Sequence, residues 1–249
     1  MLVFFVIFVL ATLGVIFAKS DSRWYIVLCS VTLATLYLFF EPLEEFDLYR
    51  HYEIFSYVEG LEWAELFELN EEYNTSFVAL LYNIYLESSP AYIVFLFGLS
   101  RFGGAKLLIF VTTLLVYGIP MYIVYSAGKK NGTDNVSINA SIIFLLFMIN
   151  YLDVSGIRNM LAVSIVLLAV YWELVLKKKR ILSFFLYVIG ILIHNSVCIL
   201  LLLRLLVLIK NKIWKTLAFL GVVAIIPVAL LLHNEGVDFS RLGYVGYCR

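Results

Sequence analysis

The sequence predicts an all-α, polytopic membrane protein with about eight spanning helices and a short helical hairpin on the outer side. Hydrophobic residues make up 63% of the chain and charged residues 14%, and the mean hydropathy is +0.97. Soluble domains have about half apolar and about a quarter charged residues. The apolar runs are long and continuous, which favours helices over the alternating strands of a barrel. We therefore expect residues 1–249 to form a single integral membrane domain.

The charges are divided between two parts of the chain. Eleven of the eighteen acidic residues lie between Glu41 and Asn74, where Arg50 is the one basic residue, so the remainder holds seven acidic and seventeen basic residues. The net charge of zero is thus the sum of ten negative and ten positive charges. We expect segment 41–74 to form a solvated, partly helical cap on one aqueous face.

The predicted spans follow from the length of each apolar run, because a helix needs about 17–25 apolar residues to cross a ~30 Å hydrocarbon core. Five runs meet this requirement: Leu2–Ala18, Trp24–Phe40, Ala105–Ser126, Ile157–Leu176 and Trp214–Leu232. Ile138–Tyr151 is shorter but is also expected to cross. Ile181–Ile209 has basic clusters at both ends and is predicted to cross twice, with His194-Asn195-Ser196 at the apex.

Residues 75–102 are predicted to form a shallow helical hairpin. The apolar pieces Phe77–Leu86 and Ala91–Leu99 are each too short to span, and Glu87-Ser-Ser-Pro90 separates them. A full span over 76–99 is the alternative, but it would place the later Lys-rich loops outside.

The orientation follows from the basic clusters near the span ends, which are retained on the cytoplasmic side. These clusters are Lys19/Arg23, Lys129/Lys130, Lys177–Arg180 and Lys210/Lys212/Lys215. If all four lie inside, the N-terminus, segment 41–74, the turn before Arg158 and the tail 233–249 lie outside. The first run lacks the features of a cleaved secretory signal, so we interpret it as a permanent span.

Arg158 is the first candidate for chemistry, because it is a cation at the outer start of a span, where this topology otherwise avoids cations. A guanidinium can grip phosphate oxygens in a bidentate fork. The alternative is an interfacial anchor or a partner for Asp153.

His194 is the second candidate, since an ionisable group at membrane depth is costly and histidine can act as a general base. The alternative is a histidine that is hydrogen-bonded to a neighbouring carbonyl.

The third candidate is Asp47-Leu-Tyr-Arg-His-Tyr52, where a carboxylate and two aromatic rings suit sugar hydroxyls and ring faces. The same mixture is also ordinary at a membrane interface.

The sequence has no nucleotide or metal motif: it has no P-loop, dinucleotide-binding glycine pattern, HExxH or Cys/His cluster. We therefore expect neither a metal nor another cofactor, and no nucleic-acid partner. The three cysteines share no CxxC spacing, which argues against a disulfide framework.

Taken together, these groups resemble the EpsG/Wzy-like family of bacterial polysaccharide polymerases. The matching stretches are Asp47–Tyr52, Gly156-Ile-Arg-Asn-Met-Leu-Ala162 and Ile193-His-Asn-Ser196, and with the span layout the similarity covers most of residues 1–232. The family usually has Arg-Gln where this chain has Arg158-Asn159. Its members tend to be longer, so we expect a short variant or a truncated copy.

The resemblance implies glycosyl transfer at the outer face of the bacterial cytoplasmic (inner) membrane, in O-antigen, capsule or exopolysaccharide synthesis. A growing glycan would leave undecaprenyl diphosphate and join a new lipid-linked repeat unit. Arg158 would stabilise the leaving diphosphate, and His194 would be the base, with Asp47 as its competitor. The substrate-binding residues would be Tyr49, Arg50, Tyr52, Asn159 and Ser196.

The expected partners are the undecaprenyl-diphosphate-linked oligosaccharide, the lipid bilayer, a chain-length regulator and a flippase. Two other functions stay open from the sequence. A transporter or flippase of lipid-linked glycans would also have many spans, although no internal repeat is visible. A membrane O-acyltransferase of surface glycans would also use buried His and Arg.

Overall fold

The computed structural model describes residues 2–16, 22–39, 41, 47–67, 77–148, 156–177, 180–208, 213, 216 and 221. All regular secondary structure within these residues is helical, which confirms the predicted all-α class. The chain divides into two compact units, Met1–Val197 and Cys198–Arg249. Helix α11 (Cys198–Leu208) is the longest described element of the second unit.

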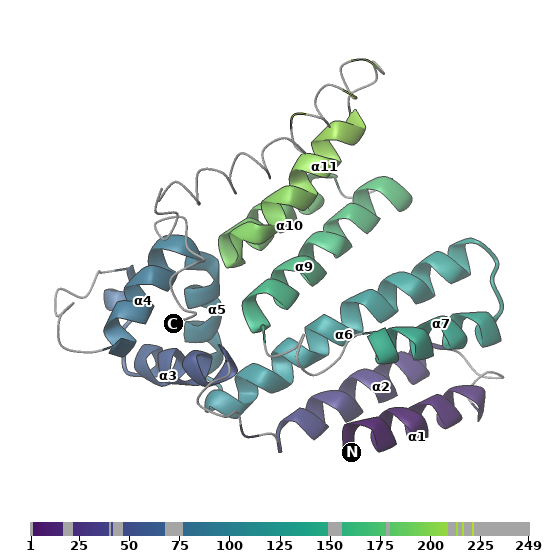
Figure 1. The fold of residues 1–249 in the computed structure, drawn as a ribbon, viewed down its shortest axis with the longest axis horizontal. Coiled ribbons are helices and arrows are strands. Elements are labelled where there is room, and N and C mark those ends of the chain that lie inside the picture. The colour runs from purple at the N-terminus through teal and green to yellow at the C-terminus, as the bar shows by residue number, and fades with distance from the viewer. Residues whose placement is uncertain are drawn as a thin grey trace. The chain divides into compact units, whose positions relative to one another are not determined.

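The first unit contains nine α-helices within its described residues (Figure 1). They are α1 (Leu2–Ile16), α2 (Ser22–Tyr37), α3 (Asp47–Glu59), α4 (Phe77–Ser88), α5 (Pro90–Ser100), α6 (Ala105–Lys130), α7 (Asn135–Met148), α9 (Ile157–Val170) and α10 (Arg180–Ile193). A π-helix over Tyr171–Val175 continues α9, and short 3-10 turns cover Glu65–Phe67 and Asn195–Val197.

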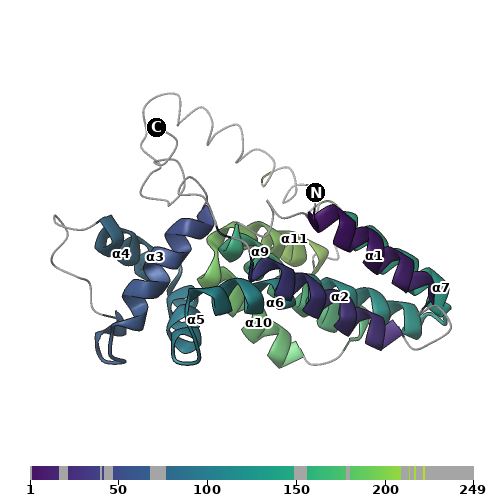
Figure 2. The same cartoon turned by 90° about the horizontal axis from the view of Figure 1, so that it is seen from below.

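Several helices of this unit pack against helices that are distant in sequence, with α1 beside α7, α2 beside α6 and α6 beside α9, and α9 also packs against the next helix, α10. Helices α3, α4 and α5 pack together as a separate group at one end, as both views show (Figures 1 and 2). Buried polar side chains satisfy backbone groups inside the helix pairs. The Tyr25 hydroxyl donates to the Leu10 carbonyl at 2.9 Å, and Asn139 donates to the Gly14 carbonyl at 3.0 Å.

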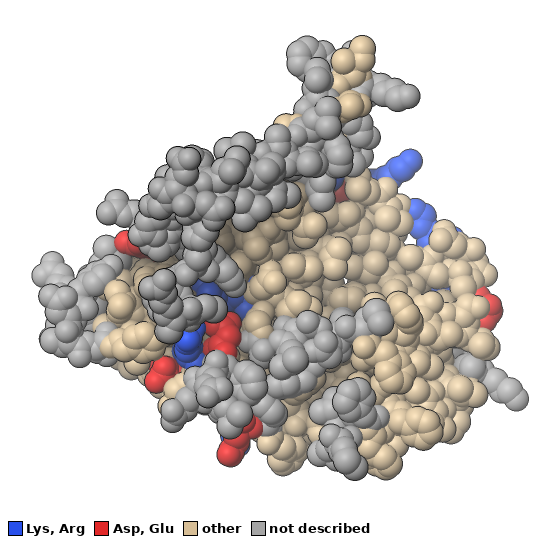
Figure 3. All heavy atoms as spheres, viewed as in Figure 1, with Lys and Arg blue, Asp and Glu red and all other residues tan. Residues whose placement is uncertain are grey.

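Two described helices, Ala105–Lys130 and Ile157–Val175, are long and apolar enough to cross a membrane, and the other apolar helices among the described residues are shorter. The eight predicted spans are therefore not confirmed. Large apolar side chains such as Phe8 (67% exposed) and Trp24 (69% exposed) face outward. Most of the described surface visible in Figure 3 is uncharged. Apart from Thr216 and Gly221, the predicted span Trp214–Leu232 and the tail 233–249 lie outside the described residues.

Helix α6 is longer than the sequence predicted, since it ends at Lys130 rather than at Ser126, and Pro120 lies inside it, as in the predicted span. Helix bundles tolerate such a proline where neighbouring groups re-satisfy the freed carbonyl. The Lys130 ammonium donates to the Val175 carbonyl at the end of the π-helix. Helices α6 and α9 are therefore parallel, and Lys129, Lys130 and Lys177 lie at the same end.

The acidic segment packs more closely than the predicted solvated cap. Helix α3 buries one face completely, and the buried residues are Leu48, His51, Ile54, Phe55 and Val58. Their spacing of three or four residues is that of an amphipathic helix. The sequence prediction treated segment 41–74 as one unit, and the glutamates that recur every three residues do not fit an amphipathic helix. Most of those glutamates follow α3 in the chain, so they hid the regular spacing within α3 itself.

The two short helices predicted on either side of Glu87–Pro90 are present as α4 and α5, which are separated by Ser89 alone. Proline at the first position of α5 suits a helix start, because its missing N–H would have no intrahelical partner there. The break predicted at His194 is also present, between α10 and the turn Asn195–Val197. These two breaks place polar residues beside long apolar helices.

We predict that Gly190→Ala destabilises the first unit. A Cβ at Gly190 would lie 2.5 Å from Cγ2 of Val166 on α9, so the α9–α10 contact would have to open, at a cost of about 1–3 kcal/mol. The check is the apparent Tm of the detergent-solubilised protein. Gly98→Ala is the matched control, since a Cβ there meets nothing within 4 Å. Equal Tm values for both variants would contradict close packing at Gly190.

Candidate functional site

Arg158 is the second residue of α9 and lies against the junction of α4 and α5. Its guanidinium carbon lies 3.7 Å from the centre of the Tyr85 ring, and Nη1 donates to the Ser89 hydroxyl at 3.3 Å. Its Nε is buried and has no hydrogen-bond partner among the described residues. Asp153, the alternative partner suggested by the sequence, lies outside the described residues.

The Tyr85 ring contacts one face of the Arg158 guanidinium, and the Ser89 hydroxyl contacts part of its edge. Stacking on an aromatic ring uses the face of the guanidinium plane and leaves N–H groups along its edge. The starts of α5 and α9 meet here, and neither has a side-chain cap within the described residues. Helix N-termini favour anions, so the arginine and two helix starts make a local anion-attracting surface.

Asp47 and His51 lie one turn apart on α3 and are hydrogen-bonded, with Nε2 of His51 3.0 Å from Oδ2 of Asp47. The His51 side chain is fully buried, whereas that of Asp47 is 40% exposed. The imidazole ring packs against the rings of Tyr85 and Tyr92, at centroid distances of 5.7 and 5.2 Å. A buried, immobilised histidine therefore fixes the orientation of an accessible carboxylate.

The electrostatics of this pair favour an ionised carboxylate and a neutral ring. Burial alone would raise the pKa of Asp47, but the His51 hydrogen bond and the charges of Arg158 and Arg50 outweigh it, and the pKa lies below its ordinary value. Burial lowers the pKa of His51 more than the Asp47 carboxylate raises it. Since a carboxylate only accepts, the neutral His51 donates through Nε2, and its Nδ1 carries the lone pair.

His194 follows the last residue of α10, and its backbone N–H donates to the Gly190 carbonyl at 2.9 Å. Its side chain is almost fully buried, and Nδ1 accepts the backbone N–H of Ser196 at 3.1 Å. The Ser196 hydroxyl donates to Oδ1 of Asn159 at 2.8 Å. This bond ties the His194 turn to the residue after Arg158, and the charges of Arg158 and Asp47 both act on the His194 ring.

The hydrogen bond from Ser196 determines which nitrogen of His194 carries the proton. Since Nδ1 accepts a backbone N–H, the neutral ring is protonated at Nε2. Nε2 is then a hydrogen-bond donor, and the lone pair that a base requires is already used at Nδ1. The geometry suits His194 to donating a hydrogen bond more than to removing a proton.

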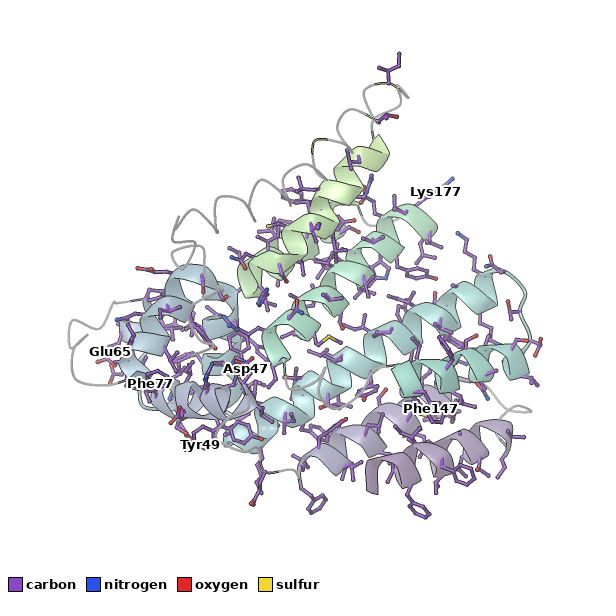
Figure 4. The ribbon with its side chains drawn as sticks, viewed as in Figure 1. Asp47, Tyr49, Glu65, Phe77, Phe147 and Lys177 are labelled. Carbon is purple, nitrogen blue, oxygen red and sulfur yellow. The ribbon has the colours of Figure 1, made fainter. Side chains whose placement is uncertain are left out.

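The remaining predicted residues, Tyr49, Arg50 and Tyr52, all lie on α3 but do not face one point. Tyr49 lies about 200° around the helix from Asp47, and Figure 4 shows it on the side of α3 away from α9. The Tyr52 hydroxyl is buried without a partner among the described residues, and burial raises the pKa of Tyr52 to about 12. Of these three residues, Arg50 acts on the site through its charge, which lowers the pKa of Asp47.

Sequence reasoning missed Tyr85, Ser89 and Tyr92, which contact Arg158 or His51. The pattern Ser89-Pro90 was a usable signal, because it puts a hydroxyl at a break between two apolar helices. Nothing local marks the two tyrosines, since the chain has seventeen. Among the described residues, no group of three or more His, Cys, Asp or Glu side chains could hold a metal ion.

Comparison with known proteins assigns the family. No curated protein and no solved structure matches this chain. The family model described as EpsG matches residues 45–239, which is more than half of the chain and includes Asp47, Arg158 and His194. This match confirms the family resemblance, and it associates the chain with membranes and polysaccharide biosynthesis. The protein therefore belongs to the EpsG family.

Proposed function

We propose that this protein is a polysaccharide polymerase. It transfers a growing glycan from undecaprenyl diphosphate to a lipid-linked repeat unit at the outer face of the bacterial inner membrane. The observation that carries this proposal is the arrangement of Arg158 and Asp47. The Arg158 guanidinium, whose buried Nε has no partner among the described residues, lies within electrostatic range of an accessible, ionised carboxylate. Transfer from a diphosphate needs a cation for the leaving group and a base for the acceptor.

The reaction is a displacement at the anomeric carbon of the donor glycan. The acceptor hydroxyl oxygen forms a bond to that carbon, while the bond from the carbon to the diphosphate oxygen breaks. The electron pair leaves with the diphosphate, which remains on its lipid carrier. Arg158 and the two helix starts stabilise the negative charge that develops there.

The acceptor proton passes to a base, and of the two candidates we propose Asp47. Its carboxylate is ionised and accessible, and His51 holds its orientation. A carboxylate is also the usual base for activating a hydroxyl beside an anomeric carbon. Ser196 and Asn159 hold His194 in position, with its proton on Nε2.

The proposed topology keeps eight crossings with the N-terminus outside. Two basic clusters, Lys129/Lys130 and Lys177, lie at one end of α6 and α9, as the positive-inside rule predicts for the cytoplasmic side. Arg158 lies at the opposite end of α9. The acceptor and donor would therefore meet on the outer side, where lipid-linked repeat units are polymerised.

Arg158→Ala is expected to lower kcat by about 10²–10³-fold, because the leaving diphosphate loses a preorganised donor. Arg158→Lys should restore little, since an ammonium cannot stack on Tyr85 and form a fork at once. The measurement is the glycan ladder of a deletion strain carrying each variant, together with the rate of the purified, reconstituted protein. Arg101→Ala is the matched control, because Arg101 also stacks on a ring, that of Phe97, at 4.2 Å.

Normal-length polymer from a stably inserted Arg158→Ala protein would refute this role for the arginine. The deletion strain separates the other functions. Accumulated unflipped repeat units would indicate a flippase, and full-length but unmodified chains would indicate an acyltransferase.

Asp47→Asn is expected to lower kcat by about 10²–10⁴-fold, the usual contribution of a general base. Because the pKa of Asp47 lies below its ordinary value, the wild-type rate should be flat around neutral pH and fall only in acid, as the carboxylate is protonated. The check is the pH profile of kcat/KM. A fall near neutral pH that disappears in His194→Gln would instead identify His194 as the base.

His51→Leu, which has no hydrogen-bond donor, tests whether His51 acts through Asp47. Loss of its hydrogen bond removes an influence that lowers the pKa of Asp47, so the acid limb of the pH profile should move to higher pH. KM should change little, since His51 is fully buried and contacts no substrate. An unchanged acid limb, measured on correctly inserted protein, would exclude this positioning role.

A further inference from the structure

The first unit contains a hollow of about 510 Å³ whose described lining is entirely apolar. Its walls come from α5, α6, α9 and α10, with Phe67 at one edge. The lining residues closest in sequence to the polar site are Pro90, Ala91, Leu161, Leu192 and Ile193. This volume lies within the range of about 300–1,000 Å³ found for small-ligand sites. We call this hollow the apolar groove.

Residues that line the apolar groove are close neighbours in sequence of residues in the polar site. Pro90 follows Ser89, which accepts the hydrogen bond from Arg158. Leu161 lies on α9 three residues after Arg158, and Ile193 directly precedes His194. Apolar walls therefore begin within one helical turn of the arginine.

The groove also opens to the side of the helices. Val94 on α5 is 37% exposed, and Ile189 and Leu192 on α10 are each 40% exposed. The described residues of these two helices that line the hollow are all apolar. The arginine and the uncapped helix starts favour an anion at the adjoining end. The combined site is thus complementary to an amphiphile with an anionic head and a hydrocarbon tail.

We propose that the apolar groove binds the diphosphate-proximal isoprenoid units of the donor's lipid carrier, and that this contact seats the diphosphate on Arg158. The proposal rests on the proposed function for the identity of the carrier. The charge complementarity between Arg158 and the carrier's diphosphate selects this occupant over an uncharged lipid. Binding energy from the tail is thereby used to orient the reacting bond.

The kinetic test uses the full-length chain reconstituted in lipid nanodiscs. Val94→Trp places an indole at the open side of the apolar groove. Val188→Trp is the matched control, because Val188 is also 37% exposed but does not line the groove. Donors carry the same glycan on undecaprenyl diphosphate or on methyl diphosphate, which has no isoprenoid unit to enter the groove.

We expect Val94→Trp to raise KM about tenfold for the undecaprenyl donor, which corresponds to losing contact with roughly two methylene groups. KM for the methyl donor should change less, because it makes no contact with the groove, and Val188→Trp should behave like the wild type with both. If Val94→Trp left KM for the undecaprenyl donor unchanged, or if both tryptophan variants altered it equally, the proposal would be overturned.

A binding test separates the groove from the polymerase activity. Undecaprenyl diphosphate with a diazirine on its first isoprenoid unit is photo-crosslinked to the reconstituted protein, and the labelled peptides are mapped. Labelling of α5 and α10 that excess undecaprenyl diphosphate removes and phosphatidylglycerol does not would support the groove even in a protein without polymerase activity. Labelling elsewhere, or equal competition by phosphatidylglycerol, would refute it.

Discussion

The site depends on one contact, the stacking of Arg158 on Tyr85 together with its hydrogen bond to Ser89. A guanidinium beside long apolar helices is costly unless protein groups replace part of its hydration. The aromatic ring and the hydroxyl do so, while the buried Nε of Arg158 has no partner among the described residues. The same contact connects α9 to the group formed by α3, α4 and α5, and so determines how near the carboxylate of Asp47 lies to the cation.

Asp47 and His194 are held by different kinds of partner, which gives them different chemistry. His51 donates to Asp47 from a fully buried position and stabilises the charged form of an accessible carboxylate. The Ser196 backbone N–H occupies Nδ1 of His194 and leaves a donor at Nε2. Histidine is the more familiar base at neutral pH, but its hydrogen bond decides which role is available to it.

The polar site and the apolar groove together are complementary to a lipid-linked anion, because the first attracts the anionic group and the second suits the hydrocarbon chain. Their proximity results from two helix breaks, at Ser89 and at His194, which bring polar groups to the ends of apolar helices. A polar break beside an apolar wall can place a diphosphate and its hydrocarbon tail at once. The groove opens between α5 and α10, so a carrier would reach it from the side.

The sequence by itself determined the helical class, both helix breaks and the polar groups around Asp47, Arg158 and His194. Run length, breaking residues and charge are local properties, and the family match agreed with them. Only the tertiary structure decided the partners. Tyr85 and Ser89 reach Arg158 from 69 or more residues away, and no local pattern distinguishes one tyrosine among seventeen. The packing of α3 was also hidden, because its buried face depends on the neighbouring α4, α5 and α6. Side-chain contacts between distant helices arise from packing geometry, which residue spacing along one helix does not encode.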